Sequence, residues 1–393
     1  MSPSIRGKAL FGAFAAALIV SLPPHHCAAA DSAVPTLIHA ERKAGTEGVK
    51  IVHGTPSFWY PTVGALLGKR EICSATLIGC NTVLTAAHCV ANDKDARNYK
   101  VYFQHAGLFS LAGTVAYQST FRWPDDHTSL ADVAVLKLAK PVEGIAPFAI
   151  NDEREHDPDL PGLTVGYGVT GGGNGDYGLK RFGPVVAAAC PPAAQKTDLL
   201  CWKFDDGRGS DVCDGDSGGP LFLSQGRTRP VITGVTSGGS PTCQVPDHPF
   251  DASVYSNRVW IESTAGGDLV TTACGSVTPL QDSETRYHGF AGQLNRTNAK
   301  DEFQIEIGAT HQLRVAVSLG KPIGTSIFEV ISQPKLSIER ADPGAGQAAP
   351  VCQSMAQAAY CSINSPVDGK YTIVLTSDET TKIADYQLVI SVF

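Results

Sequence analysis

The sequence has no block of like charges and no apolar run long enough to cross a membrane. Its net charge of −7 is spread over 393 residues, which is not the pattern of a nucleic-acid-binding surface. The apolar run at 9–22 contains fourteen residues, whereas a membrane-spanning helix needs about 20. We therefore expect no nucleic-acid partner and, once the start of the chain has been removed, no membrane partner.

The start of the chain has the features of a secretory signal. Arg6 and Lys8 precede the apolar run, and the small residues Ala28, Ala29 and Ala30 follow it. A positive start, a short apolar run and an A-x-A site define a signal peptide, so we predict cleavage after Ala30 and a secreted protein. A membrane anchor is the alternative, and the shortness of the run argues against it.

The sequence also lacks a pair of cysteines in CxxC spacing with histidines downstream, the pattern of a zinc site, so we expect no metal. Removal of the signal takes Cys27 with it and leaves ten of the 11 cysteines. Export to an oxidising compartment and an even number both favour disulfides. The ten are Cys73, Cys80, Cys89, Cys190, Cys201, Cys213, Cys243, Cys274, Cys352 and Cys361.

Long helical patterns are absent, and short β-rich runs recur between turn residues, which predicts an all-β protein of barrels or sandwiches. In the first part of the chain the runs are 74–78, 100–104, 133–138, 163–165, 220–223 and 231–235. After a stretch containing Gly, Ser and Pro they are 302–307, 312–318, 371–376 and 386–392. We expect a signal at 1–30, a propeptide at 31–50, a first domain at 51–274, a linker at 275–284 and a smaller β-sandwich domain at 285–393.

Ser217 lies in a glycine-rich turn, Cys-Asp-Gly-Asp-Ser-Gly-Gly-Pro, at 213–220. A serine hydroxyl is a poor nucleophile until a neighbouring base takes its proton, so a histidine and an orienting carboxylate are needed. His88 stands beside Cys89, which can fix its position, and Asp132 stands at the entry to the apolar run 133–138. These three residue types predict nucleophilic catalysis.

With these motifs, the stretch from Ile51 to Cys274 resembles the trypsin and chymotrypsin family of serine proteases. The resemblance implies two six-stranded antiparallel β-barrels with the active site in the cleft between them. It implies that Ser217 is the nucleophile, His88 the general base and Asp132 the acid that orients the base. The activity it implies is endopeptidase cleavage of protein or peptide substrates through an acyl-enzyme, without a cofactor. Protein protease inhibitors are a further class of partner that it implies.

The same resemblance implies an activation step and an oxyanion hole. Ile51, which opens the sequence Ile-Val-His-Gly, would become a new N-terminus after a cut behind Lys50, and its ammonium would be buried against Asp216. The chain would then be a zymogen. The N–H groups of Gly215 and Ser217 would form the oxyanion hole. The segment Val-Gly-Tyr-Gly at 165–168 matches the family's glycine-aromatic-glycine motif.

A specificity pocket follows from the resemblance as well. Asp211, six residues before the nucleophile, corresponds to the base of trypsin's pocket and would pair with an Arg or Lys side chain of the substrate. Ser237 and Gly239 would belong to the pocket wall, although the family usually has an aromatic residue where Gly238 stands. Ser253 would line the pocket in place of a glycine, and its hydroxymethyl group would narrow the space.

The family's disulfides imply three pairs: Cys73 with Cys89, Cys190 with Cys201, and Cys213 with Cys243. Cys352 and Cys361 are near enough in the sequence to pair with each other. Cys80 and Cys274 remain, and their pairing would tie the end of the first domain to its first barrel. Sequence alone does not fix this connectivity.

Two alternatives to an active protease can be compared. The Gly-x-Ser-x-Gly pattern at 215–219 also occurs in the α/β-hydrolases, but there a helix follows the serine, whereas Pro220 and a β-rich run follow it here. The second alternative is a catalytically inactive protease homologue that serves as a binding or adhesion module. The presence of His88, Asp132 and Ser217 favours activity. The last domain loosely resembles the C-terminal β-sandwich modules of secreted bacterial proteases, and its role stays open between secretion, stability and substrate binding.

Overall fold

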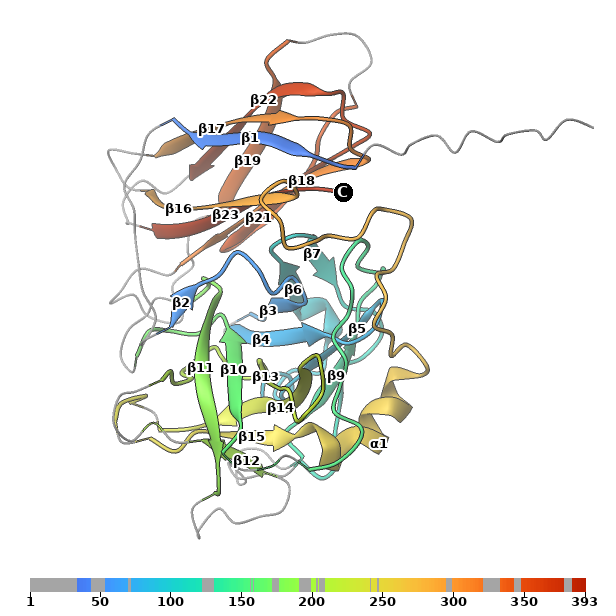
Figure 1. Cartoon of the computed structure of the whole chain (residues 1–393), viewed down its shortest axis with the longest axis vertical. Helices are drawn as coiled ribbons and strands as arrows, with labels where there is room; N and C mark the ends of the chain where they lie inside the picture. Colours follow the sequence, from blue (N-terminus) through green and yellow to red (C-terminus); the bar gives the residue numbers. More distant parts are fainter. Residues whose placement is uncertain are drawn as a thin grey trace, which may run out of the picture. The chain divides into compact units, whose positions relative to one another are not determined.

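The structure is a computed structural model of the chain (Figure 1). The residues that it describes are 34–43, 54–69, 72–121, 131–155, 157, 159–171, 177–190, 199–202, 204, 209–240, 242–245, 247–294, 299–320, 333–342, 348–377 and 384–393. The expected signal at 1–30 and the expected activation site at Lys50 and Ile51 lie outside these residues.

The first barrel is an antiparallel sheet with the strand order β7-β6-β3-β4-β5-β9-β8. An isolated bridge between Leu111 and Leu138 joins the ends of β7 and β9, so the six longer strands close on themselves. The strands are β3 (Val63–Leu67), β4 (Ile72–Leu77), β5 (Thr82–Thr85), β6 (Lys100–Phe103), β7 (Gly107–Ser110), the short β8 (Ala116–Tyr117) and β9 (Ala134–Lys137).

The second barrel has the order β10-β13-β14-β15-β12-β11-β2, and β10 also pairs with β11, which closes the ring of six longer strands. The strands are the short β2 (Thr55–Pro56), β10 (Pro161–Gly166), β11 (Arg181–Ala188), β12 (Leu199–Trp202), β13 (Pro220–Leu223), β14 (Val231–Gly238) and β15 (Phe250–Ser253). The helix α1 (Val254–Ala265) follows β15 directly, with Ser253 as its N-cap and Gly266 in the left-handed conformation at its C-terminal end.

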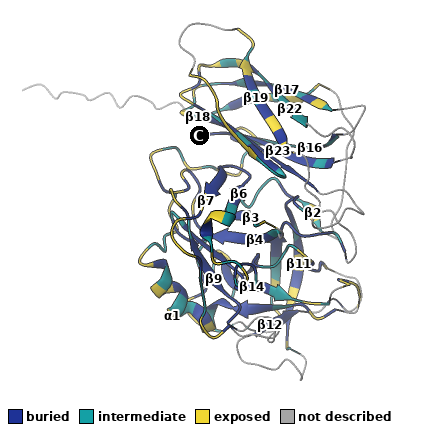
Figure 2. Ribbon diagram, turned by 180° about the vertical axis from the view of Figure 1, so that it is seen from behind, coloured by how far each residue is buried: buried dark blue, intermediate teal, exposed yellow. Residues whose placement is uncertain are grey.

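One apolar core connects the two barrels. Val63 and Leu84 of the first barrel and Phe222 and Val235 of the second belong to the same cluster of buried residues, which also includes Ile261 of α1. Figure 2 shows that most barrel strands are buried along their length. Burial of apolar surface is the main favourable contribution to folding, so this shared core holds the barrels together and fixes the space between them.

The rest of the described chain forms two antiparallel sheets, β1-β17-β22-β19 and β16-β23-β18-β21-β20. Their inner residues alternate with outer ones, as in β17, and pack against each other as one β-sandwich core. The strands are β1 (Leu37–Arg42), β16 (Tyr287–Leu294), β17 (Lys300–Ile307), β18 (Gln312–Leu319), β19 (Pro334–Arg340), β20 (Val351–Met355), β21 (Ala358–Asn364), β22 (Gly369–Ser377) and β23 (Ala384–Val392).

The strand β1 comes from the opposite end of the chain to its neighbours in the sheet. Figure 1 shows it in blue among the orange and red strands of the sandwich. It lies within the segment 31–50, for which the sequence predicts a propeptide and no strand. The sandwich is therefore built from one strand that precedes the two barrels in the sequence and from eight strands that follow them.

Buried polar contacts join the sandwich to the barrels. The Gln387 side chain accepts the backbone N–H of Lys180 and donates to the backbone oxygen of the same residue, at 2.9 Å in each case. Gln104 donates to the Gln387 side-chain oxygen at 2.9 Å, and Arg314 Nη1 donates to the backbone oxygen of His105 at 3.2 Å. Residues 34–393 accordingly form one compact unit.

The expected all-β class, with a double barrel followed by a sandwich, is confirmed, and so are the expected disulfides. The helix α1 was not predicted. Of the helices that the structure describes, none is long and apolar enough to cross a membrane. The disulfides are Cys73–Cys89, Cys80–Cys274, Cys190–Cys201, Cys213–Cys243 and Cys352–Cys361.

Candidate active site

His88 and Asp132 meet because the strands next to them pair. β5 pairs with β9 in the register Thr85↔Ala134, so the chain that leaves β5 and the chain that enters β9 lie at the same end of the sheet. His88 is three residues beyond β5, and Asp132 is two residues before β9. His88 Nδ1 lies 2.7 Å from Asp132 Oδ2, and the backbone N–H of His88 donates to Oδ1 at 2.9 Å.

The carboxylate of Asp132 is buried, with the residue only 3% exposed. Ser237 in β14 donates its hydroxyl to Asp132 Oδ2 at 2.6 Å. Burial alone would raise the pKa of Asp132, but the charge of His88 and the hydrogen bonds from His88 and Ser237 lower this pKa below its usual value. Asp132 is therefore held as an anion that can orient His88 and stabilise a charged imidazole.

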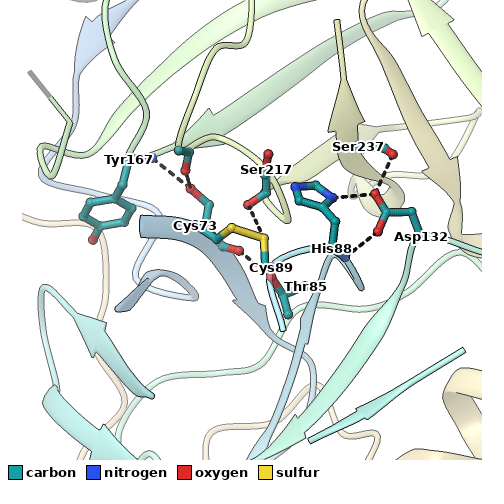
Figure 3. The surroundings of a disulfide bond; sticks show 10 residues. Cys73, Thr85, His88, Cys89, Asp132, Tyr167, Ser217 and Ser237 are labelled. Atoms are coloured by element: carbon teal, nitrogen blue, oxygen red, sulfur yellow. Dashed lines mark hydrogen bonds and ion pairs between the residues drawn. A yellow bond between two sulfur atoms is a disulfide. The ribbon is translucent and has the colours of Figure 1, made fainter. Parts of the chain in front are cut away.

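The turn at 213–219 presents Ser217 to His88. The backbone N–H of Ser74 donates to the backbone oxygen of Ser217 at 2.8 Å, and the backbone N–H of Gly218 donates to the backbone oxygen of Thr236 at 2.8 Å. These bonds tie the turn to both barrels. Figure 3 shows the His88 ring between Asp132 on one side and Ser217 on the other. The structure thus brings together the three residues that the sequence singled out.

Gly215 gives the turn its shape. Its φ of +95° is in the region that favours glycine, and an added Cβ would come within 3.0 Å of the Gly168 Cα. Ser74 Oγ donates to the Gly215 oxygen at 3.0 Å. Within the described part of the chain, neither the N–H of Gly215 nor that of Ser217 donates a hydrogen bond. Both groups are available to a negatively charged oxygen.

The glycine-aromatic-glycine motif makes room for Asp216. A Cβ on Gly166 would lie 2.1 Å from Asp216 Oδ1, and one on Gly168 would lie 2.5 Å from Asp216 Oδ2. The carboxylate accepts the N–H groups of Gly168 at 2.8 Å and Cys213 at 3.0 Å. Burial raises the pKa of Asp216 to about 6, and the two N–H bonds and the charge of Arg181 oppose this effect. The tight space explains why glycines flank the aromatic residue.

Asp211 shares its surroundings with Asp247, a buried residue that the sequence did not single out. Burial, first, and the charge of Asp247, second, raise the pKa of Asp211 to about 7. Oδ1 of Asp211 accepts the N–H of Val212 at 2.8 Å, whereas Oδ2 has no hydrogen-bond donor among the described residues. A Cβ on Gly239 would lie 3.3 Å from Asp247 Oδ2. Asp247 therefore contacts both the expected base and the expected wall of the pocket.

These observations agree with the comparisons with known proteins. The family described as Trypsin matches residues 51–261, more than half of the chain. The chain belongs to the trypsin family. Its relatives include a trypsin of Saccharopolyspora erythraea, which is 31% identical over 46% of this chain and 80% of that protein. Others are a vitellin-degrading protease of Bombyx mori, 31% identical over 51% of this chain and 78% of that protein, and the clotting factor G beta subunit of Tachypleus tridentatus, 27% identical over 57% and 80%.

Two of the pocket residues expected from the trypsin family have other contacts. Ser237 directs its hydroxyl to Asp132, so only its backbone remains for a pocket wall. Ser253 caps α1 by accepting the N–H of Ser256 at 3.1 Å, and its hydroxyl donates to Glu155 at 3.1 Å. A place for Ser253 in the pocket remains a prediction, and the structure gives its hydroxyl a capping role.

Three residues near the site carried no local signal in the sequence. Asp247 is an isolated acid in a loop, Ser74 stands within an ordinary apolar strand, and Arg181 begins β11. Arg181 donates to the backbone oxygen of Gly168 at 2.8 Å in buried surroundings. Each acts through contacts with distant parts of the chain, and the trypsin-family motif alone does not name them.

The described residues contain one group whose atoms lie as close together as metal ligands do: Cys73, His88 and Cys89. Both sulfurs are already joined in the Cys73–Cys89 disulfide, and a metal requires thiolates. Within this group the disulfide leaves no thiolate to ligate a metal.

Proposed function

We propose that the protein is a serine endopeptidase that uses His88, Asp132 and Ser217. The observation that carries this proposal is the 2.7 Å contact between His88 Nδ1 and Asp132 Oδ2, with the ring between Asp132 and Ser217 (Figure 3). This arrangement leaves Nε2, on the other side of the ring, toward the serine. Membership of the trypsin family supports peptide-bond hydrolysis as the reaction.

The reaction has two steps. Ser217 Oγ attacks the peptide carbonyl while His88 Nε2 takes its proton, and the imidazolium then gives that proton to the leaving amine. The acyl-enzyme is released by water, which His88 activates in the same way. Asp132 stabilises the imidazolium in both steps. The N–H groups of Gly215 and Ser217 bind the oxyanion, and each such donor contributes about 10²- to 10³-fold in rate.

The protein is secreted and made as a zymogen, and a cut after Lys50 activates it. The five disulfides support export to an oxidising compartment. Asp216 supports the activation step, because its carboxylate is enclosed by Gly166 and Gly168 and its pKa is raised by burial. A carboxylate in such a place is stabilised by a cation, and the ammonium of Ile51 would supply one.

The substrate side chain at the cleaved bond is Arg or Lys. Two buried acids, Asp211 and Asp247, lie together, and the charge of one opposes ionisation of the other. A guanidinium or ammonium group that enters the pocket relieves this repulsion and receives hydrogen-bond acceptors. Oδ2 of Asp211, which has no hydrogen-bond donor among the described residues, supports this assignment.

Hydrolysis of matched peptide substrates ending in Arg, Lys, Phe or Ala tests the proposal. The protein is cut after Lys50, and Ser217→Ala is the control. Cleavage after Arg or Lys that disappears in the control is expected. Cleavage after Phe or Ala would keep the triad and overturn the pocket assignment. Folded, correctly cut protein that cleaves none of the substrates would favour an inactive homologue with a binding role.

A further inference from the structure

The segment before the activation site is part of the sandwich. β1 pairs antiparallel with β17, with Ala40 opposite Ile305 and Arg42 opposite Phe303. β1 lies at the edge of its sheet. The pairing is extended at both ends of the strand by further backbone bonds, from Gly308 to the oxygen of Thr36 at 2.9 Å and from Lys43 to the oxygen of Glu302 at 3.0 Å.

The side chains of β1 enter the sandwich core as well. Leu37 is 5% exposed and packs in the core of the sandwich. Arg42 Nη2 lies 2.9 Å from Asp301 Oδ2, and this carboxylate is almost fully buried. The Tyr386 hydroxyl donates to the same oxygen at 2.5 Å, and Arg42 Nη1 donates to the backbone oxygen of Ala291 at 3.1 Å. Asp301 therefore has its cation supplied by β1.

Loss of β1 would leave unfavourable groups behind. Asp301 would be buried with no charge from Arg42, and breaking a buried ion pair in this way is strongly destabilising. The edge of β17 would expose a row of unpaired backbone groups, which is a template for pairing with another strand. The segment 31–50 has no cysteine, so no disulfide of its own can retain it.

We propose that the sandwich is the binding site of segment 34–43 and holds it non-covalently after the cut behind Lys50. This rests on the proposed activation step. The active protease is then a two-chain protein, and its partner chain is the former propeptide, added as a strand to β17. The C-terminal sandwich thereby acquires a specific ligand, a short peptide whose Arg42 is directed at the buried carboxylate of Asp301.

The test uses the full chain with Ser217→Ala. This variant cannot cut itself by the proposed mechanism while retention of the fragment is measured. Residues 45–50 are replaced by the recognition sequence of a site-specific protease, and the protein is cut there. Size-exclusion chromatography and native mass spectrometry then show whether the fragment stays. We expect it to remain bound until a denaturant is added. Separation of the fragment on cutting would overturn the proposal.

Two variants on the same strand sharpen the test. Arg42→Leu removes the ion pair and should speed release of the cut fragment at least about tenfold. Ile38→Ala is the matched control, because Ile38 is 58% exposed, and release should be unchanged. Equal release rates for Arg42→Leu and the parent would contradict the role of Asp301.

If Arg42→Leu fails to fold, a second measurement takes its place. The cut parent protein is mixed with a labelled synthetic peptide of residues 34–50, and the rate at which the peptide replaces the bound fragment is measured. Slow exchange of the parent's fragment is expected, and exchange within the mixing time would overturn retention. Failure of the proposed function would give a different result from failure of fragment binding. A cut chain that keeps Ser217, retains its fragment and cleaves no substrate would remove the protease assignment and leave the binding site intact.

Discussion

The hydroxyl of Ser237 lies 2.6 Å from Oδ2 of Asp132, the same oxygen that faces the imidazole of His88. One carboxylate oxygen thus receives hydrogen bonds from both barrels, because Ser237 belongs to β14 and His88 follows β5. Hydrogen bonds at the site itself therefore add to the shared core in holding residues of the first barrel against the second.

Ser237→Ala should lower kcat about tenfold and change KM little. A hydrogen bond to a charged group contributes about 1.5–3 kcal/mol, and its loss weakens the support of the Asp132 anion, while the backbone at Ser237 is kept. Steady-state kinetics with an Arg substrate measure the effect. Ser256→Ala is the control, because the Ser256 hydroxyl bonds Glu155 in exposed surroundings. Equal kcat values for the two variants would show that the bond is dispensable.

Asp247→Asn should move the pH dependence of cation binding in the pocket. The pKa of Asp211 is raised to about 7 by burial and by Asp247, so Asp211 gains its charge, and its attraction for a cation, as the pH rises through about 7. Removing the like charge lowers this pKa, and binding should set in at correspondingly lower pH.

The measurement is the affinity of a small aromatic amidinium ion for the Ser217→Ala protein between pH 5 and 9. Asp159→Asn removes one exposed acid and serves as the control for net charge. Superimposable pH profiles for Asp247→Asn and Asp159→Asn would rule out the contact between Asp211 and Asp247 as the cause.

Gly166→Ala should reduce kcat at least about 10²-fold, because its Cβ would lie 2.1 Å from Asp216 Oδ1 and the carboxylate must move together with the turn that we propose forms the oxyanion hole. Thermal unfolding should show a loss of about 1–3 kcal/mol from overpacking. Gly308→Ala is the control, because a Cβ there meets only ordinary contacts at 3.6 Å and beyond. An active Gly166→Ala protein would mean that Asp216 can shift without moving Ser217.

His105 should make the folded protein less stable in acid. It is buried between Ser391, 2.7 Å from Nδ1, and the backbone oxygen of Phe58, 2.8 Å from Nε2. Burial, with the charges of Lys180 and Arg314, lowers its pKa to about 3. Between about pH 6.5 and 3 the unfolded chain therefore binds a proton that the folded chain does not, and stability falls with the pH in this window.

His105→Asn should flatten this part of the pH dependence. The variant is expected to be less stable at pH 7.5 by about 1–3 kcal/mol, since it loses a buried hydrogen bond, and the difference from the parent should shrink toward pH 4.5. Denaturant unfolding at a series of pH values measures it. If the difference in unfolding free energy between the variant and the parent stayed constant with pH, groups other than His105 would cause the acid sensitivity.

The sequence predicts six of the twelve longer barrel strands, β4, β6, β9, β10, β13 and β14, because their signals are local, and it predicts the disulfides largely through the family motif. β1 was missed for a physical reason. A register shift between Leu37 and His39 interrupts the alternation of the strand, and its remaining side chains are largely polar because it lies at an edge. The neighbours that stabilise it are more than 250 residues away in the sequence.

The helix α1 and Asp247 illustrate two other limits. α1 has helical spacing in its buried residues Val254, Asn257, Ile261 and Ala265, but β-branched residues within it weaken the helical signal. Asp247 belongs to no helical or strand pattern in the sequence. Its importance comes from the fold, which brings it to Asp211, and no pattern within its own loop indicates that contact.

The position of β1 also has a consequence for synthesis of the chain. About 260 residues separate Arg42 from Lys300, where the partner strand β17 begins. During translation, β1 therefore emerges from the ribosome long before β17 has been synthesised. The barrels can fold in the meantime around their shared core, since domains fold as units from the N-terminus during translation. The sandwich is completed last, when the two ends of the chain meet. The protease is thus topologically an insertion between the first and second strands of another domain.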